Sequence, residues 1–345
     1  MRKLASIQRI LEIKSIDNAD KIEVVSILGW KVVVKKDEFK VGDLCVYVEL
    51  DSVLPPKPEF EFLVKYKYRV KTVRLRGQVS QGLCFPLSVL DGLKYQNDTR
   101  EAPVYEWKED QEVTDILGVI KYDPPEISSG GGFLQGQTAG NFPCYVPKTD
   151  ELRLQASPKL LKELVGIPLY VTEKIDGTSA TFSILDGEVN VCSRNRAVKD
   201  DKNNVYWKMA RKYKIIDILN SNPGIAIQGE IAGPGIQGNK LGLAELDLFI
   251  FNVYDIKIGS YFTADQFFDF CKVNNLTTVP QLDETIILTD EPTIEGFLNL
   301  AKGKYASGHP REGIVVRARD NKYSPSLKGR LSFKVINNDF LLKEK

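Results

Sequence analysis

The first part of the chain alternates apolar and polar positions in short runs, the pattern of β-strands that bury one face. Such runs occur at 22–25, 30–34 and 44–50. Turn-forming residues separate them at Asn18, Gly29, Gly42-Asp43 and Pro55-Pro56. Short strands with close turn signals predict a small barrel or sandwich, and a barrel of the oligonucleotide-binding (OB) type fits the length. We assign residues 1–122 to this β-barrel domain.

Residues 123–146 interrupt this pattern with Pro124-Pro125, a serine and glycine run at 128–132, and further glycines. Such a composition predicts a flexible linker. Glycine-rich loops also bind phosphate, but this segment follows no predicted strand and lacks the Gly-Lys-Ser/Thr signature of a phosphate-binding loop. We therefore expect a linker.

From residue 147 to residue 345 strand and helix periodicities are mixed, which predicts an α+β domain with antiparallel sheets and flanking helices. Asp186-Gly187 predicts a hairpin turn within 168–194. Residues 205–219 have helical spacing, with Asn203 or Asn204 as the N-cap, and residues 263–266 open a second helix as a capping box. Further strands are predicted at 248–254, 313–318 and 331–336.

Composition limits the possible chemistry. The 345 residues are 43% hydrophobic and 27% charged, and no apolar run reaches the ~20 residues that span a bilayer. The N-terminus shows no apolar signal segment, so we expect an intracellular protein without a membrane partner. The five cysteines lack metal-ligand spacing and His309 is the only histidine, which argues against zinc sites and most histidine-dependent catalysis. With a formal net charge of +1, nucleic-acid binding would depend on local basic patches.

The sharpest chemical signal is the sequence Glu-Lys-Ile-Asp-Gly-Thr at residues 173–178. It lies where a predicted strand reaches a turn, so the tip of Lys174 can point into a groove. A lysine nucleophile must lose its proton, and a nearby divalent cation or buried cationic side chain would lower its reference pKa of ~10.4. Alone the motif is weak evidence, because a solvent-exposed lysine before an Asp-Gly turn has the same sequence.

Five further segments follow the lysine motif in a fixed order. They are 193–195 with Arg194, 228–237 with Glu230, 248–255 with Phe251, 311–317 with Glu312, and 332–335 with Lys334. Over residues 147–338 this order resembles the covalent nucleotidyltransferases, the superfamily of DNA ligases, RNA ligases and mRNA capping enzymes. We therefore assign residues 147–345 to a nucleotidyltransferase catalytic domain.

Several details resemble the RNA ligases within that superfamily. Thr178-Ser179 follows the motif where DNA ligases and capping enzymes usually place an arginine at the position of Ser179. The segments around Glu230 and at 147–155 are also similar to RNA ligases. Residues 15–22 look like the opening of tRNA-binding OB modules, and an OB module before the catalytic domain resembles the fifth RNA-ligase family. One departure is Ile336, where related enzymes often have a second lysine that Arg330 or Lys328 would have to replace.

The resemblance implies an ATP-dependent RNA ligase that joins 3′-OH and 5′-phosphate ends through a lysyl-AMP on Lys174 and uses Mg²⁺ or Mn²⁺. The implied nucleotide-binding residues are Glu173, Ile175, Arg194, Glu230, Phe251 and Lys334. The implied metal-binding residues are Asp176, Glu230 and Glu312, because hard cations prefer oxygen ligands. Phe251 would stack on adenine, with Phe249 as the alternative, since only one of the two was expected to face the pocket. Arg194 would contact a phosphate or the RNA 3′ end, unless it is only a surface arginine.

A basic stretch in the barrel domain suggests a nucleic-acid surface. It consists of Arg69, Lys71, Arg74 and Arg76, with Tyr66 and Tyr68 just before them. Side chains two apart on a strand share a face, so Arg74 and Arg76 are expected to form one stripe. Basic residues interleaved with aromatic residues suit phosphate contacts and base stacking. A protected edge strand would carry similar charges and is the alternative.

Two other functions are compatible with parts of the sequence. A DNA ligase or capping enzyme usually carries an OB domain after the last motif, where only residues 337–345 follow here. A non-catalytic RNA-binding protein would tolerate loss of Lys174 or Glu312, and both are present. We expect a monomer that acts on RNA in a nicked duplex or an RNA/DNA hybrid, in nick sealing or RNA repair.

Overall fold

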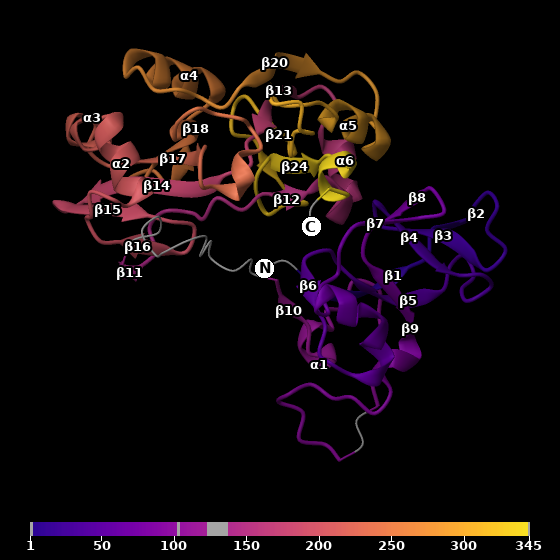
Figure 1. Ribbon diagram of the computed structural model, residues 1–345. Helices are drawn as coiled ribbons and strands as arrows, with labels where there is room; N and C mark the ends of the chain where they lie inside the picture. Colours follow the sequence, from indigo (N-terminus) through magenta and orange to yellow (C-terminus); the bar gives the residue numbers. More distant parts are fainter. Residues whose placement is uncertain (1–2, 102–103, 123–136, 344–345) are drawn as a thin grey trace. The chain divides into compact units, whose positions relative to one another are not determined.

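The computed structural model describes residues 3–101, 104–122 and 137–343 (Figure 1). The chain divides into two compact units. The N-terminal unit comprises Met1–Asp123, Gln155–Pro158 and Leu341–Lys345, and the C-terminal unit comprises Pro124–Leu154 and Lys159–Phe340. Most of the predicted linker, residues 123–136, lies outside the described residues. The domain boundaries therefore stay predictions.

The N-terminal unit is built from short antiparallel strands. One three-stranded sheet has the order β1 (Ala5–Arg9), β5 (Leu44–Val48) and β9 (Leu83–Pro86), and another has β2 (Glu12–Ser15), β3 (Ile22–Ile27) and β4 (Trp30–Lys35). Two-stranded pairs join β7 (Val73–Leu75) to β8 (Gln78–Ser80) and β6 (Ser52–Val53) to β10 (Ile120–Lys121). The helical segments are η1 (Pro58–Tyr66), η2 (Leu87–Leu90) and α1 (Thr114–Leu117).

Alternation along the strands supplies the core of this unit. In β4 Trp30, Val32 and Val34 are buried while Lys31 and Lys35 are exposed, as expected for a strand with one face against the core. The largest buried side chains of this unit are aromatic and aliphatic, including Trp30, Tyr47, Phe60, Ile7, Ile10, Ile27, Leu50 and Leu54. The pattern of short strands around one apolar core is the one that the sequence predicts.

A seven-stranded sheet forms one half of the C-terminal unit. Its order is β11 (Thr138–Asn141), β16 (Arg196–Val198), β15 (Glu188–Cys192), β14 (Thr178–Leu185), β17 (Ile225–Ala232), β18 (Asp247–Asp255) and β19 (Ser260–Tyr261), with antiparallel neighbours. Apolar residues from α2 (Val205–Lys212), α3 (Ile215–Ser221) and α4 (Ala264–Val273) pack on one face (Figure 1). The helices therefore bury one side of this sheet.

A five-stranded sheet forms the other half. Its order is β12 (Leu152–Arg153), β24 (Ser332–Ile336), β21 (Gly313–Ala318), β13 (Pro168–Lys174) and β20 (Gln281–Ile287). One face packs in an apolar cluster with residues of η4 (Pro158–Glu163) and α5 (Ile294–Ala301). The remaining elements are η3 (Leu154–Ala156), η5 (Gln237–Asn239), β22 (Tyr323–Ser324), β23 (Gly329–Arg330) and α6 (Asn338–Leu341).

The faces turned away from these apolar clusters carry polar residues, because successive side chains of a strand point to opposite faces. On β17 Ile227 and Ile231 join the helix-side cluster, whereas Gln228 and Glu230 point the other way. On β24 Phe333 and Val335 join the second cluster, whereas Lys334 lies on the opposite face. Two polar faces are thus available to build a site.

Most predicted elements are confirmed, with two differences. The strands at 248–254, 313–318 and 331–336, the hairpin at Asp186-Gly187 and the capping box of Thr263 are all present. The single predicted helix 205–219 is instead two helices, because Lys214 adopts a left-handed φ of 51° between α2 and α3. Residues 138–141 of the predicted linker form β11, which pairs with β16.

Among the described residues, no helix has both the length and the apolar character needed to cross a lipid bilayer. This finding agrees with the absence of a long apolar run in the sequence.

The cap of α2 gives the first prediction. Asn204 is buried, and its side-chain oxygen accepts a 2.8 Å hydrogen bond from the amide of Tyr206. Replacing an N-cap asparagine by alanine typically costs ~1 kcal/mol, so Asn204→Ala should lower the free energy of unfolding in urea by about that amount. Asn203→Ala is the matched control and should change it by less than about 0.5 kcal/mol. Equal losses in the two variants would show that the cap is not the cause.

Candidate functional site

Lys174 is the last residue of β13, and its ammonium group lies 2.8 Å from the carboxylate of Glu312. Glu312 immediately precedes β21, which pairs with β13 so that Lys174 is opposite Gly313. Both side chains are largely buried, at 24% and 16% exposed. The strand pairing therefore brings two motifs that are far apart in sequence into direct contact.

Tyr305 fixes this junction. Its hydroxyl donates a 3.0 Å hydrogen bond to the carbonyl of Lys174 and accepts one of 3.0 Å from the amide of Glu312. One buried side chain thus holds the end of β13 against the start of β21. The sequence analysis missed Tyr305, because it lies outside every motif and a tyrosine between two strands has no distinctive pattern.

Two glycines allow the strands to approach closely at the site. A Cβ atom at Gly177 would lie 2.3 Å from the carbonyl oxygen of Ile231 and 2.8 Å from the side chain of Glu230. A Cβ atom at Gly313 would lie 2.1 Å from the carbonyl oxygen of Val335. Neither position has room for a side chain, so both motifs require glycine for space.

The carboxylates around Lys174 control its protonation. Burial lowers the pKa of Lys174, but the negative charges of Glu312, Glu230 and Asp176 outweigh burial, so the pKa lies above the ordinary lysine value. Burial raises the pKa of Glu230 to about 8 and that of Asp176 to about 6, with Glu312 adding to both. Without a bound cation, Lys174 is therefore held as a protonated, ion-paired lysine.

Lys334 brings a second positive charge to the same sheet face. It pairs with Val315, which also pairs with Thr172, two residues before Lys174 on β13. Burial, followed by the charges of Lys174 and Arg153, lowers the pKa of Lys334 to about 7. An anion bound nearby would favour the protonated form, because the opposite charge offsets both effects.

Asp176 is held by a lysine that no motif includes. The carboxylate of Asp176 lies 2.6 Å from the ammonium group of Lys240, with the two side chains 12% and 22% exposed. Two of the three carboxylates predicted to bind metal are therefore paired with lysines in this structure.

The two phenylalanines of β18 correct one prediction. Phe249 lies opposite Glu230 in the β17–β18 pairing, and Phe249 and Phe251 both pack against the apolar cluster that includes Ile175. The expectation that only one would face the pocket is wrong, because residues two apart on a strand share a face. The pairing of β17 with β18 contains a bulge beside Phe251, and the side chain of Asn252 donates a hydrogen bond to that of Gln228.

Glu173 and Arg194 have partners of their own. Strand alternation turns Glu173 away from the face of Lys174, and its carboxylate lies 3.9 Å from the guanidinium of Arg311. Burial raises the pKa of Glu173, against the opposite effect of Arg311. The Nη2 atom of Arg194 donates to both carboxylate oxygens of Asp150, at 2.6 and 2.8 Å, on an exposed part of the unit. Their predicted roles with nucleotide remain predictions.

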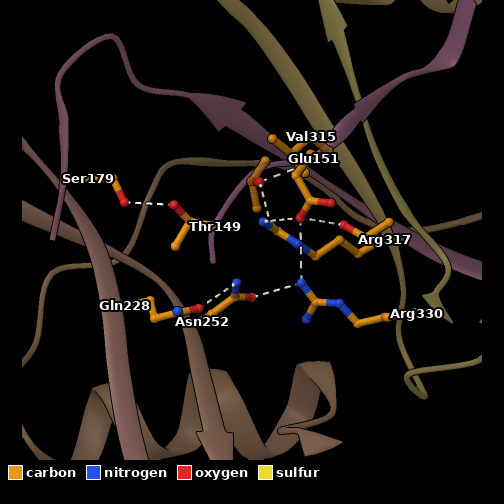
Figure 2. A network of polar contacts seen from close by, with 10 residues as sticks. Thr149, Glu151, Ser179, Gln228, Asn252, Val315, Arg317 and Arg330 are labelled. Atoms are coloured by element: carbon orange, nitrogen blue, oxygen red, sulfur yellow. Dashed lines mark hydrogen bonds and ion pairs between the residues drawn. The ribbon is translucent and has the colours of Figure 1, made fainter. Parts of the chain in front are cut away.

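Beside the lysine pair, a polar network joins the inner faces of the two sheets (Figure 2). Glu151 accepts from Ser332 at 2.7 Å and lies 3.4 Å from Arg317 and 3.5 Å from Arg330. Arg330 donates to Asn252 of β18 at 3.0 Å and stacks on Tyr261 at 3.8 Å from the ring centre. Burial opposes ionisation of Glu151, but the two arginines outweigh it and lower its pKa. This network fixes one sheet against the other.

Position 336, where related enzymes often have a second lysine, is buried. Ile336 lies opposite Gly313, in the row of residues that begins with Lys174. Arg330 is engaged in the polar network, and Lys328 is exposed in the turn between β22 and β23. An open cavity of about 150 Å³ adjoins Arg330, Asn252 and Lys148.

The three carboxylates do not form a complete metal-binding cage. Within the described residues, no group of three or more His, Cys, Asp and Glu side chains is placed to hold a metal ion by itself. Mg²⁺ and Mn²⁺ suit oxygen ligands, and Mg²⁺ usually keeps several waters and binds one or two carboxylates plus substrate phosphates. Asp176, Glu230 and Glu312 fit such a partial set of ligands.

The basic stretch of the N-terminal unit is divided between two environments. Arg69 pairs with Asp51 at 2.7 Å and stacks on Tyr122 at 3.8 Å. Arg74 is exposed on β7, whereas Arg76 is exposed in the following turn with a φ of 47°. The expected stripe on one strand is therefore wrong, because β7 ends at Leu75. Lys71 lies between these groups and is partly exposed.

Comparisons with known proteins agree with this architecture. A family model described as an OB-fold domain matches residues 4–87, and one described as RNA ligase matches residues 167–336. Solved structures of a Naegleria gruberi RNA ligase are similar over the whole length. A mutant with ATP and Mn is 35% identical with a TM-score of 0.86, and the similarity covers 99% of each chain. A mutant with AMP and Mn is 34% identical, with a TM-score of 0.85 and 99% of each chain covered. A comparison with curated protein sequences finds no match.

The raised pKa of Glu230 predicts a pH dependence of stability. A carboxyl group whose pKa rises from 4.5 to about 8 on folding favours the folded state at low pH, and this contribution is lost as the pH rises through that range. In metal-free buffer, the free energy of unfolding should therefore fall between pH 5 and pH 8. Glu230→Gln should reduce this fall, as measured by urea denaturation at both pH values. Identical pH dependence in the two proteins would contradict the assignment.

Proposed function

The chain belongs to the RNA ligase family and is an ATP-dependent RNA ligase, and from that premise we propose that Lys174 carries the AMP group between ATP and RNA. The observation that supports this role is the buried contact between Lys174 and Glu312, with Glu230 and Asp176 beside them. A lysine surrounded by carboxylates, with a second lysine on the same sheet face, suits nucleophilic attack on a phosphate.

The first step is attack of the Lys174 nitrogen on the α-phosphorus of ATP. A nitrogen–phosphorus bond forms, the bond from the α-phosphorus to the bridging oxygen breaks, and pyrophosphate leaves. The ammonium proton must go to another group first, and the carboxylate of Glu312, 2.8 Å away, is placed to accept it. Lys334 offsets charge that develops on the α-phosphate oxygens.

Two further transfers complete ligation. A 5′-phosphate oxygen attacks the phosphorus of lysyl-AMP, which breaks the nitrogen–phosphorus bond and forms an adenylylated RNA end. A 3′-OH then attacks the 5′-phosphorus, forms the new phosphodiester and releases AMP. Arg194 is exposed and suits a contact with one of these phosphates, because a guanidinium fork matches phosphate geometry.

Adenine would bind beside Phe249 and Phe251, which lie on the face of Glu230 and offer aromatic surface for stacking. The carboxylates Asp176, Glu230 and Glu312 would hold Mn²⁺ or Mg²⁺ through oxygen atoms and waters. When bound, the cation supplies positive charge to the phosphates. The Naegleria structures that contain ATP and Mn support this choice of cofactors.

The physiological substrate that we propose is an RNA nick in a duplex or an RNA/DNA hybrid, sealed by a monomeric enzyme. Sealing requires a 3′-OH and a 5′-phosphate held in line, and a complementary strand helps by holding the two ends next to each other. The exposed basic residues Arg74 and Arg76 of the N-terminal unit are the proposed backbone contacts.

Adenylylation of Lys174 can be tested directly. After incubation with ATP and Mn²⁺, the intact protein should gain the mass of one AMP group. Lys174→Ala should remove this gain completely, because it removes the nucleophile. Lys208→Ala, at an exposed position of α2, is the control and should behave like wild type. An AMP adduct on Lys174→Ala at any other residue would overturn the assignment.

The proposed RNA contacts predict a separation of the reaction steps. Arg74→Ala/Arg76→Ala should form lysyl-AMP at the wild-type rate but bind nicked RNA more weakly. Each lost phosphate contact flattens the plot of log affinity against log salt by about 0.7–0.9, so the slope should change by up to about 2. Lys35→Ala/Lys36→Ala is the control, because it removes the same charge from exposed positions elsewhere in the unit, and its slope should stay close to that of the wild type. An unchanged slope in the arginine variant would show that these arginines make no phosphate contacts and only protect a strand edge.

A further inference from the structure

Lys240 is a third ammonium group in the site, and its role is not explained by the reaction steps above. Its nitrogen lies 2.6 Å from Asp176, while Lys174 lies 2.8 Å from Glu312. Asp176 is only two residues from the nucleophile. Two carboxylates of the site are therefore each paired with an ammonium group of this chain, Glu312 with Lys174 and Asp176 with Lys240.

The loop around Lys240 holds this lysine in place. The side chain of Asn239 donates to the carbonyl of Leu243 at 2.9 Å and accepts from its amide at 3.0 Å, which closes the loop on itself. Gly242 packs so closely on Ser307 that a Cβ atom would lie 2.9 Å from it. Leu241, the next residue, is buried in the cluster beside Ile175. The pairing with Asp176 is thus built into the loop.

The ammonium of Lys240 also has an aromatic neighbour. It lies 4.4 Å from the centre of the Phe340 ring, within range of a cation–π interaction. A lysine side chain is flexible and makes no fixed fork of hydrogen bonds, so its ammonium can exchange one anionic partner for another. Phe340 remains available to the lysine stem during such an exchange.

From these contacts we propose that Lys240 is a resident counter-cation of Asp176, which a divalent cation displaces, and that the displaced ammonium binds the polyphosphate of the nucleotide. The inference rests on the proposed role of Asp176 as a metal ligand. A divalent cation on the carboxylate of Asp176 repels the ammonium group of Lys240 and withdraws charge from the oxygen that holds it, so metal binding weakens their contact. The polyphosphate of ATP is bonded to the α-phosphorus that Lys174 attacks, on the side opposite the attacking nitrogen, and the flexible side chain of Lys240 would supply an ammonium group to that part of the site once Asp176 releases it.

The counter-cation also explains how the metal-free protein avoids an uncompensated charge at Asp176. A buried carboxylate without a partner is strongly unfavourable. Lys240 removes that cost at Asp176 before metal and nucleotide arrive. It follows that the metal-free protein should bind a divalent cation more weakly than its carboxylates alone would allow.

Metal binding without nucleotide tests the first half of the proposal. The full-length protein is freed of AMP with pyrophosphate and metal, dialysed, and titrated with Mn²⁺ while free Mn²⁺ is measured by electron paramagnetic resonance. Lys240→Met should bind Mn²⁺ about 10-fold more tightly, because the ammonium group that competes for Asp176 is gone. Lys240→Arg keeps the charge and should stay close to wild type. Unchanged or weaker Mn²⁺ binding by Lys240→Met would overturn the counter-cation role.

Pyrophosphate binding tests the second half. By calorimetry, Lys240→Met should bind inorganic pyrophosphate about 10-fold more weakly in the presence of saturating Mn²⁺, and equal affinity would overturn the polyphosphate contact. Lys212→Met removes a comparable lysine–aspartate pair, 3.0 Å from Asp247, and should alter neither measurement. Circular dichroism and the thermal midpoint verify that each variant is folded.

Asp176→Asn separates failure of this inference from failure of the proposed function. If Asp176→Asn leaves Mn²⁺ affinity unchanged, Asp176 is not a metal ligand, and the metal site in the proposed function is wrong. If Asp176→Asn weakens Mn²⁺ binding, and Lys240→Met adds no gain in that background, the competition acts through Asp176 as proposed. A full gain in that background would overturn the proposed pairing while leaving the metal site intact.

Discussion

The site depends on how closely the backbone at Gly177 approaches the carbonyl of Ile231. No Cβ atom fits between them, since the gap would be 2.3 Å. This approach brings Glu230 of one sheet beside Lys174, the last residue of a strand in the other sheet. A larger residue at position 177 would push the start of β14 away from β17 and move Glu230, whose charge influences the protonation of Lys174. The Asp-Gly pair of the motif is therefore a packing requirement as well as a turn.

Charge compensation is the second constraint, because the polar faces of two sheets meet where most proteins place an apolar core. Paired side chains of opposite charge compensate the buried charges on these faces. Lys174 pairs with Glu312, and the arginines Arg317 and Arg330 surround Glu151. The apolar clusters lie on the outer faces of the same two sheets, where they supply hydrophobic stabilisation. Stability and chemistry thus come from opposite faces of the same strands.

Sequence patterns predicted most strands and the motif residues, because alternation and motif spacing are local properties. Two errors were local. Phe249 and Phe251 share a face, as alternation itself requires, and the expected stripe of Arg74 and Arg76 is broken by a turn after Leu75. Other features depend on distant parts of the chain. Tyr305 could not be found in advance, because its hydrogen bonds join residues 131 and 7 positions away. Its role exists only after the two strands pair.

The exposed contact between Arg194 and Asp150 has a consequence for how ligands enter. A carboxylate has two oxygens spaced much like those of a phosphate, and both oxygens of Asp150 contact one terminal nitrogen of Arg194. Exposed ion pairs contribute only ~0–1 kcal/mol, so an anion that binds this arginine more strongly can replace the carboxylate. Until such an anion arrives, Asp150 keeps the charge of the guanidinium compensated by the protein's own side chain.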